Sequence, residues 1–355
     1  MKLAVVTSGF PRRSETFVLN ELLALDAAGV LGRIFALKPG DGSPLQPGAR
    51  RLLPRVAYVP AARTQVRAAL VADALRDQSI AGVHAYFAHE PAEVAAAAAA
   101  LLRVPYSFSA HALDVRKVAT ASLHARAAAA RCVIACNADV AGELDAAGAA
   151  PQLLPHGVDL ARFRPQPEPV DDMPTLLAVG RLVPKKGFDV LIDAAARLRR
   201  PFRLRIVGDG PERDALAARI GSIGLASRVS LESPLTHAEL PAAYAAANVV
   251  VVPSVLDSAG DRDGLPNVVL EALAVKRAVV ASDIAAIGTA IQHGRTGVLA
   301  TPGDAEGLAT ALERLLSDRD GRGRLAAAGC RLVEREFDLG RCTDRLVGFL
   351  EGAYA

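Results

Sequence analysis

Short apolar runs alternate along the chain with longer segments in which apolar residues recur every three or four positions. The runs are typical of buried strands, and the longer segments are typical of amphipathic helices. In the first half, the pattern predicts strands at residues 2–6, 33–37, 83–88, 106–109, 132–135 and 152–155. It predicts helices at residues 16–28, 64–78, 91–102, 115–130 and 138–147. Strands and helices that alternate in this way indicate right-handed crossovers and a parallel sheet.

The alternation is interrupted once, by a segment rich in proline and acidic residues at 165–174, and then restarts. After this segment we expect strands at 175–179, 203–207, 228–231, 249–252 and 278–281. The expected helices are at 187–199, 211–223, 236–246, 265–275, 304–317, 320–334 and 338–352. A proline-rich segment without an apolar period is typical of a linker.

The repeated strand–helix pattern predicts an α/β protein with two doubly wound, Rossmann-like parallel sheets. We expect an N-terminal domain at 1–165, a linker at 166–174 and a second domain at 175–335. The remaining residues, 336–355, end in a helix that either stays on the second domain or crosses back to the first. Because ligands of parallel sheets bind at the carboxyl ends of the strands, we expect the site in the cleft between the domains.

The composition argues against several classes of protein. A chain of 355 residues is too long for one ordinary core, which agrees with two domains. Its longest apolar run, at 94–102, is too short to span a membrane, and its N-terminus lacks the features of a signal peptide. The four cysteines show neither metal-ligand spacing nor a disulfide framework, so we expect a cytoplasmic protein. A net charge of +3 with few aromatic residues argues against a nucleic-acid partner and leaves open a peripheral contact with the inner membrane surface.

A polar loop, GDRDGLP at 260–266, leads into the predicted helix 265–275. The free N–H groups at the start of a helix bind anions and hydroxyl-rich groups. Asp263 lies at this start, and Glu271 follows about two turns along the helix. The two carboxylates could hold opposite ends of an extended polar ligand. The alternative is an acidic first turn followed by an ordinary surface glutamate.

A second candidate loop, at 180–187, follows the first strand of the second half. Its Arg181 and Lys186, beside the start of a helix, would supply the charge and the backbone donors that a diphosphate needs, although solvated basic loops have the same composition. A glycine-rich turn at 208–210 follows the next strand and either approaches a ligand closely or simply reverses the chain. Neither half carries G-x-G-x-x-G after its first strand, which argues against an NAD-dependent dehydrogenase.

Seven stretches of the chain resemble, in family order, the retaining glycosyltransferases of family 4, which have the GT-B fold and are also described as glycosyl transferases group 1. The stretches are SETFV at 14–18, HALD at 111–114, PHGVD at 155–159, VGRL through KGFD at 179–189, IVGDGP at 206–211, residues 260–274 and GRTGVL at 294–299. Each stretch is weak alone, but together they span nearly the whole chain. The SETF start and the GDRDGLP loop are similar to enzymes that build exopolysaccharide or colanic-acid-type polymers.

The resemblance implies the substrates and the site. A nucleotide-diphosphate sugar would be the donor, a glycan or lipid-linked molecule would be the acceptor, and neither a cofactor nor a metal would be needed. The catalytic residues would be Arg181 and Lys186 at the diphosphate, Asp263 at the donor sugar and His111 near the reacting carbon. The other donor-binding residues would be Gly9, Gly208, Asp209, Gly210, Gly264, Leu265 and, at the ribose, Glu271. The acceptor-side residues would be Ser14, Glu15 and Thr16.

The chain departs from the family pattern at the sugar-facing and base-facing edges. Asp263 stands where the family has a glutamate, and His156 stands where it commonly has an asparagine. Residues 274–279 lack the usual glycine and proline, and residues 285–289 lack two glycines and a carboxylate.

Three functional hypotheses follow from the family features that this chain retains and from these departures. The first is an active retaining glycosyltransferase of the hexosyltransferase type, acting in polysaccharide biosynthesis. The second is a degenerate, non-catalytic homologue that binds a nucleotide sugar or a glycan as a partner subunit. The third is a GT-B epimerase or a phosphorylase, and a glycogen-type phosphorylase would need a much longer chain. The intact Arg181, Lys186, His111 and Glu271 favour the first hypothesis.

Overall fold

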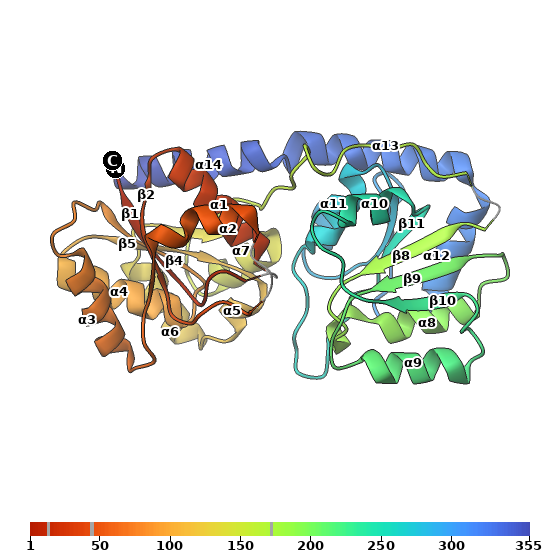
Figure 1. Ribbon diagram of the computed structural model, residues 1–355, viewed down its shortest axis with the longest axis horizontal. Helices are drawn as coiled ribbons and strands as arrows, with labels where there is room; N and C mark the ends of the chain where they lie inside the picture. The colour runs from red at the N-terminus through yellow and green to blue at the C-terminus, as the bar shows by residue number, and fades with distance from the viewer. Residues whose placement is uncertain (13–14, 43–45, 171–172) are drawn as a thin grey trace. The chain divides into compact units, whose positions relative to one another are not determined.

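The computed structural model describes residues 1–12, 15–42, 46–170 and 173–355 (Figure 1). The chain divides into two compact units, the first formed by Met1–Gly157 with Gly340–Ala355 and the second by Val158–Leu339. Each unit contains one parallel sheet with apolar cores on both faces. The prediction of two Rossmann-like α/β units is therefore confirmed. Among the described residues, no helix combines the length and the apolar character that crossing a bilayer requires.

The first unit is built on seven parallel strands in the order β3-β2-β1-β4-β5-β6-β7. The strands are β1 (Leu3–Thr7), β2 (Leu31–Ala36), β3 (Val56–Tyr58), β4 (Gly82–Tyr86), β5 (Tyr106–Ala110), β6 (Val133–Ala135) and β7 (Gln152–Leu153). Leu3 and Val5 of β1 pack into the core on one face, and Ala4 and Val6 pack into the core on the other. Successive side chains of a strand point to opposite faces, so a strand covered on both sides is a continuous apolar run.

Helices cover both faces of this first sheet. One face carries α3 (Thr64–Leu75), α4 (Glu90–Leu102), α6 (Thr120–Ala129) and α7 (Ala138–Ala146). The other face carries α1 (Thr16–Ala27), α2 (Pro47–Leu52) with the short 3-10 helix η1 (Leu53–Arg55), and the C-terminal helix α14 (Leu339–Tyr354). Leu346 and Leu350 of α14 are buried in that core, and the Tyr354 hydroxyl donates to Ser107 Oγ at 2.7 Å. The end of the chain thus packs on the first unit.

The second unit contains six parallel strands in the order β10-β9-β8-β11-β12-β13. They are β8 (Thr175–Val179), β9 (Arg203–Val207), β10 (Val229–Glu232), β11 (Val249–Val252), β12 (Ala278–Ser282) and β13 (Val298–Ala300). One face packs against α8 (Phe188–Ala196), α9 (Arg213–Ser222) and α12 (Ala305–Ser317). The other packs against α10 (Leu240–Ala245), α11 (Asn267–Ala274) and the C-terminal part of α13 (Arg319–Glu336). The four valines of β11 alternate between the two cores, which accounts for its uninterrupted apolar sequence.

The segment expected as a free linker lies against the second unit. Glu168 accepts a hydrogen bond from Arg322 Nε at 2.8 Å and another from Asn248 Nδ2 at 3.2 Å. Arg277, whose side chain is buried, donates to the carbonyl oxygens of Gln166 and Pro167. The boundary between the units accordingly falls after Gly157 rather than after residue 165.

Candidate functional site

A loop at the carboxyl end of β8 carries the cations that the sequence assigns to a diphosphate. It contains the 3-10 helix η2 (Pro184–Lys186) and leads into α8. Arg181 is exposed, whereas Lys185 is buried and Lys186 is half-buried. Gly187 has a φ of +62°, and a Cβ there would lie 2.1 Å from a backbone oxygen at the end of β11. Only glycine therefore permits this close approach of the loop to the backbone that follows β11.

Both lysines pair with aspartates of the loop between β11 and α11. Nζ of Lys186 lies 2.6 Å from Oδ2 of Asp263, and Ser254 Oγ donates to the same oxygen at 3.0 Å. Nζ of Lys185 lies 2.9 Å from Oδ2 of Asp261 and 3.5 Å from Oδ1 of Asp263. Burial by itself would raise the pKa of Asp263, but the Lys186 and Lys185 ammonium groups hold that pKa below its ordinary value. The structure therefore brings together two residues, Lys186 and Asp263, to which the sequence assigns separate parts of the donor.

The two glycines after β9 allow the backbone of their loop to pack closely against the backbone of the loop after β8. A Cβ on Gly208 would lie 1.8 Å from the carbonyl oxygen of Gly180, and a Cβ on Gly210 would lie 2.3 Å from that of Leu182. Between them, Asp209 is exposed, and its carbonyl oxygen accepts a hydrogen bond from Leu182 N–H at 2.8 Å. These glycines let the loop after β9 support the cationic loop after β8.

Glu271 is buried on α11 and only 7% exposed, so its interpretation as an ordinary surface glutamate is wrong. Tyr244 of α10 donates its hydroxyl proton to Oε2 of Glu271 at 2.7 Å. Burial raises the pKa of Glu271 to about 7, although the hydrogen bond from Tyr244 acts in the opposite direction. In the loop before α11, Gly264 is buried and Leu265 is half-buried.

In the first unit, His111 follows β5 and precedes the short helix α5 (Ala112–Arg116). Its backbone N–H donates to Oδ1 of Asp114, and Oδ2 of Asp114 accepts from Ala88 N–H, both at 2.6 Å. Burial raises the pKa of Asp114 to about 7 against the effect of these bonds. Within the described part of the chain, neither ring nitrogen of the buried His111 has a hydrogen-bond partner. Buried polar atoms are normally paired, so both ring nitrogens of His111 retain unused hydrogen-bonding capacity.

A second histidine stacks on His111. The rings of His156 and His111 lie 5.1 Å apart with their planes 8° from parallel, and Phe17 packs against both rings. Nδ1 of His156 lies 2.6 Å from Oε1 of Glu21. Burial by itself would lower the pKa of His156, but the Glu21 carboxylate raises that pKa to about 10. The pKa of His111 is lowered instead, by burial and by the neighbouring His156. The pKa values of the two stacked rings are thus shifted in opposite directions, and no local pattern in the sequence pairs His156 with Glu21.

The stretch assigned to the acceptor is described only in part. Ser14 lies outside the described residues. Glu15 pairs with Arg12 Nη1 at 2.7 Å, and burial raises the pKa of the Glu15 carboxyl. Thr16 is the first residue of α1. Gly9 is buried, and a Cβ there would lie 3.3 Å from a carbonyl oxygen of the loop after β2, so Gly9 packs against that loop.

Two of the departures from the family pattern keep the backbone conformation that glycine favours. Lys276 and Ala285 stand where the family has glycine, and their φ angles are +61° and +50°. A residue with a Cβ in this region costs about 1–2 kcal/mol. The backbone shape of these two turns is therefore retained at an energetic cost, with a side chain added at each.

Comparison with known proteins connects both units to sugar transfer. The family model described as Glycosyltransferase Family 4 matches residues 14–162, and the one described as Glycosyl transferases group 1 matches residues 173–318. The alpha-D-kanosaminyltransferase of Streptomyces kanamyceticus is 35% identical over 182 residues, which cover 50% of this chain and 46% of that protein. The GDP-mannose-dependent alpha-(1-6)-phosphatidylinositol monomannoside mannosyltransferase of Mycobacterium tuberculosis is 34% identical over 214 residues, which cover 57% of this chain and 56% of that protein. The chain spans about half the length of the curated relatives that it matches.

Solved structures show the same fold over the full chain. Anabaena Alr3699/HepE, solved in complex with UDP, superposes with a TM-score of 0.84 at 20% identity, covering 99% of this chain and 100% of that chain. The sucrose-phosphate synthase of Thermosynechococcus elongatus superposes with a TM-score of 0.79 at 22% identity, covering 100% of this chain and 99% of that chain. The first unit thus matches one glycosyltransferase family model and the second unit matches another, and with the shared fold these matches identify the chain as a glycosyltransferase of the GT-B fold.

Proposed function

We propose that the protein is a retaining glycosyltransferase. It would transfer a sugar from a nucleotide-diphosphate sugar to a glycan or lipid-linked acceptor in polysaccharide biosynthesis. The observation that carries this proposal is the cluster of Lys185 and Lys186 with Asp263, on the loop that also carries Arg181, with Glu271 buried on the helix that follows Asp263. Fixed cations next to hydroxyl-binding carboxylates suit a ligand with a diphosphate between two sugars.

We assign the donor diphosphate to Arg181 and Lys186. In the free protein Lys186 is paired with Asp263 at 2.6 Å, so a diphosphate oxygen would replace one anionic partner of this ammonium group with another. As the bond between the anomeric carbon and the phosphate oxygen breaks, the electron pair remains on the diphosphate. Cations that are already in place stabilise this developing charge without reorganisation. This role needs no metal ion.

The two carboxylates would bind the two sugars of the donor. Glu271 would accept hydrogen bonds from the ribose hydroxyls, with Tyr244 fixing the orientation of its carboxylate at 2.7 Å. Asp263 would accept a hydrogen bond from a hydroxyl of the transferred sugar once the Lys186 ammonium group has turned to the diphosphate. Because the Asp263 side chain is shorter than the glutamate of the family pattern, it would favour donor sugars with a hydroxyl group within its reach.

We assign His111 of the first unit to the reacting centre and the segment with Glu15 and Thr16 to the acceptor. The unpaired ring nitrogens of His111 can bind a sugar hydroxyl. In a retaining transfer the acceptor oxygen attacks from the face that the diphosphate leaves. The departing phosphate oxygen is then the nearest base for the acceptor proton, so no protein carboxylate has to take it.

A donor panel tests the proposal. The panel contains GDP-mannose and UDP-glucose, because one relative is named as GDP-mannose-dependent and one structural neighbour was solved with UDP. We expect release of nucleoside diphosphate from at least one donor, and a loss of catalytic efficiency, kcat/KM, on the order of 100-fold in Arg181→Ala. Arg197→Ala, an exposed arginine at the end of α8, is the matched control and should keep full activity. Binding of a nucleotide sugar without turnover of any donor would refute sugar transfer and favour the non-catalytic partner subunit.

A further inference from the structure

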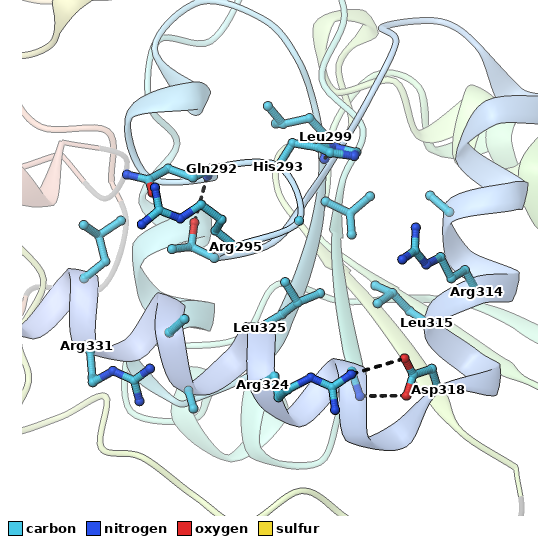
Figure 2. A pocket seen from close by; sticks show the side chains of 18 of the residues that line it. Gln292, His293, Arg295, Leu299, Arg314, Leu315, Asp318, Arg324, Leu325 and Arg331 are labelled. Carbon is cyan, nitrogen blue, oxygen red and sulfur yellow. Dashed lines mark hydrogen bonds and ion pairs between the residues drawn. The ribbon is translucent and has the colours of Figure 1, made fainter.

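The second unit contains a groove that the proposed reaction does not use. A cavity of about 1050 Å³ lies between the loop before β13, one side of α12 and the side of α13 (Figure 2). The loop at 292–297 precedes β13 and therefore lies at the amino edge of the parallel sheet. The candidate donor-binding loops follow β8, β9 and β11, at the carboxyl edge. The groove and the donor-binding loops thus lie at opposite edges of one sheet.

The rim of the groove is strongly basic. Five arginines line it, namely Arg295, Arg314, Arg324, Arg331 and Arg335, against a single carboxylate, Asp318. Five positive charges, less the negative charges of Asp318 and of Glu336, which pairs with Arg335, leave +3 at this groove, which equals the net charge of the entire chain. Positive charge is therefore concentrated here and balanced elsewhere.

Three of these arginines are available to a ligand. Arg295, Arg314 and Arg331 are exposed, and among the residues that the structure describes they have no ion-pair partner. The other two arginines face carboxylates: Nη2 of Arg324 lies 3.8 Å from Oδ2 of the exposed Asp318, and Nε of Arg335 lies 2.7 Å from Oε1 of Glu336. Arg295 comes from the loop, Arg314 from α12 and Arg331 from α13, so the three available guanidinium groups surround the groove from three elements (Figure 2).

The floor of the groove is aliphatic. Leu299, Leu315 and Leu325 line it together with small residues such as Ala311 and Ala328, as Figure 2 shows in part for the leucines. The lining residues, all between 292 and 335 in the described chain, include no Phe, Tyr or Trp. A groove for single-stranded nucleic acid normally offers aromatic side chains on which bases stack. An aliphatic floor under an arginine rim instead matches a phosphate ester attached to a hydrocarbon.

We propose that this groove binds the phosphate head group of anionic phospholipids and so attaches the second unit to a negatively charged bilayer. Arginine is suited to this role because its planar guanidinium binds phosphate oxygens in bidentate fashion. The aliphatic floor would receive the glycerol and the first methylene groups of the lipid. Such a contact is independent of sugar transfer, since none of the groove residues belongs to the candidate donor site.

Vesicle binding by the full-length protein tests the proposal. We expect co-sedimentation with vesicles of phosphatidylcholine and phosphatidylglycerol but not with vesicles of phosphatidylcholine alone. Each basic residue close to an anionic surface contributes about a fivefold gain in affinity, so the triple variant Arg295→Gln/Arg314→Gln/Arg331→Gln should bind on the order of 100-fold more weakly. The matched control, Arg63→Gln/Arg197→Gln/Arg199→Gln, removes the same charge from exposed arginines outside the groove and should bind as the wild type does. Equal losses in the two triple variants would overturn the proposal, because net charge alone would then explain binding.

A fluorescent reporter distinguishes the groove from a diffuse contact. The chain contains no tryptophan, so Leu325→Trp places a single fluorophore in the groove. We expect its emission to shift to the blue with anionic vesicles, and no shift for Leu101→Trp, which replaces a leucine that is 62% exposed on α4. No shift at position 325 despite vesicle binding would overturn the proposal. Soluble glycerol phosphate provides the arm for a free ligand: a full shift with this compound in the absence of vesicles would identify a soluble phosphate ester, not a bilayer, as the occupant.

Discussion

The pH dependence of folding tests the environment of Glu271. Burial raises the pKa of this carboxyl to about 7 from an ordinary value of 4.5. At 1.36 kcal/mol per pKa unit, this difference corresponds to about 3 kcal/mol. Because the folded state holds the proton more tightly than the unfolded state does, the protonated Glu271 adds to the free energy of unfolding, and this contribution is fully present below pH 4.5. It is lost as the pH rises through 7, so Glu271 destabilises the charged, folded second unit at alkaline pH.

The substitution Glu271→Gln removes this titration and keeps an oxygen that can accept the Tyr244 hydrogen bond. We expect the variant to match the wild type near pH 4.5 and to be more stable by about 3 kcal/mol at pH 8. Urea unfolding followed by far-UV circular dichroism measures the difference, since the chain has no tryptophan for fluorescence. Glu306→Gln, an exposed glutamate of α12, is the control and should show little pH dependence relative to the wild type. A stability difference for Glu271→Gln that stays constant from pH 4.5 to 8 would refute the reasoning.

On the proposed assignment of Glu271 to the ribose, this carboxyl should link nucleotide binding to proton release. Ribose hydroxyls donate to a carboxylate, so binding favours the charged form of Glu271 and should release a proton near neutral pH. We therefore expect the affinity for the nucleoside diphosphate of the accepted donor to rise as the pH increases through 7. Calorimetric titration in buffers with different ionisation enthalpies measures the released proton, and Glu271→Gln should abolish its release.

Three further predictions concern the loops of the second unit. Asp263→Asn should lower catalytic efficiency by roughly one to two powers of ten, because a charged hydrogen bond is lost. Asp263→Glu should also lower catalytic efficiency if the pocket is fitted to the shorter acid. Wild-type activity of both variants on every accepted donor would contradict this assignment. Gly208→Ala should lower the melting temperature and nucleotide affinity, because its Cβ would lie 1.8 Å from a backbone oxygen, whereas Gly221→Ala, with open space around it, should not. A chelator should leave activity unchanged, because lysines already neutralise Asp261 and Asp263; activity lost to EDTA and restored by magnesium would show a metal site.

The elements buried on both sides could be predicted from the sequence, whereas the edge strands β3 and β13 and the short helix α2 could not. Strands such as β11 are continuous apolar runs because both faces are covered, and such runs stand out from their surroundings. Strands β3 and β13 have three residues each and lie at the edges of their sheets, so no run or alternation identifies them. Helix α2 begins with Pro47-Gly48 and has no apolar period, which is why the sequence does not predict it.

The loops of the candidate site could be predicted because each follows a strand, but their side-chain pairs could not. Lys186 and Asp263 are 77 residues apart, and Glu21 and His156 are 135 residues apart. Such contacts depend on how the two sheets and their loops fold, which a local pattern does not contain. The same holds for Tyr244, whose hydroxyl partner lies on a neighbouring helix. A carboxylate in an apolar helical stretch is the one local signal for Glu21 and Glu271, because burial of such a group requires a partner.

The different environments of Arg181 and Lys186 predict different kinetic roles for these two cations. Lys186 is half-buried and neutralised by Asp263 in the free protein, so it exerts little attraction on a distant donor. Arg181 is exposed and, on the proposed assignment, would supply the attraction that draws the diphosphate in. As negative charge grows on the leaving diphosphate, the half-buried ammonium group, in its less polar surroundings, responds more strongly than an exposed guanidinium. Arg181→Ala should therefore mainly raise KM, and Lys186→Ala should mainly lower kcat, by a factor on the order of 100. Steady-state kinetics with the accepted donor separates the two effects, and equal changes of kcat and KM in both variants would show that the pairing of Lys186 with Asp263 has no influence on catalysis.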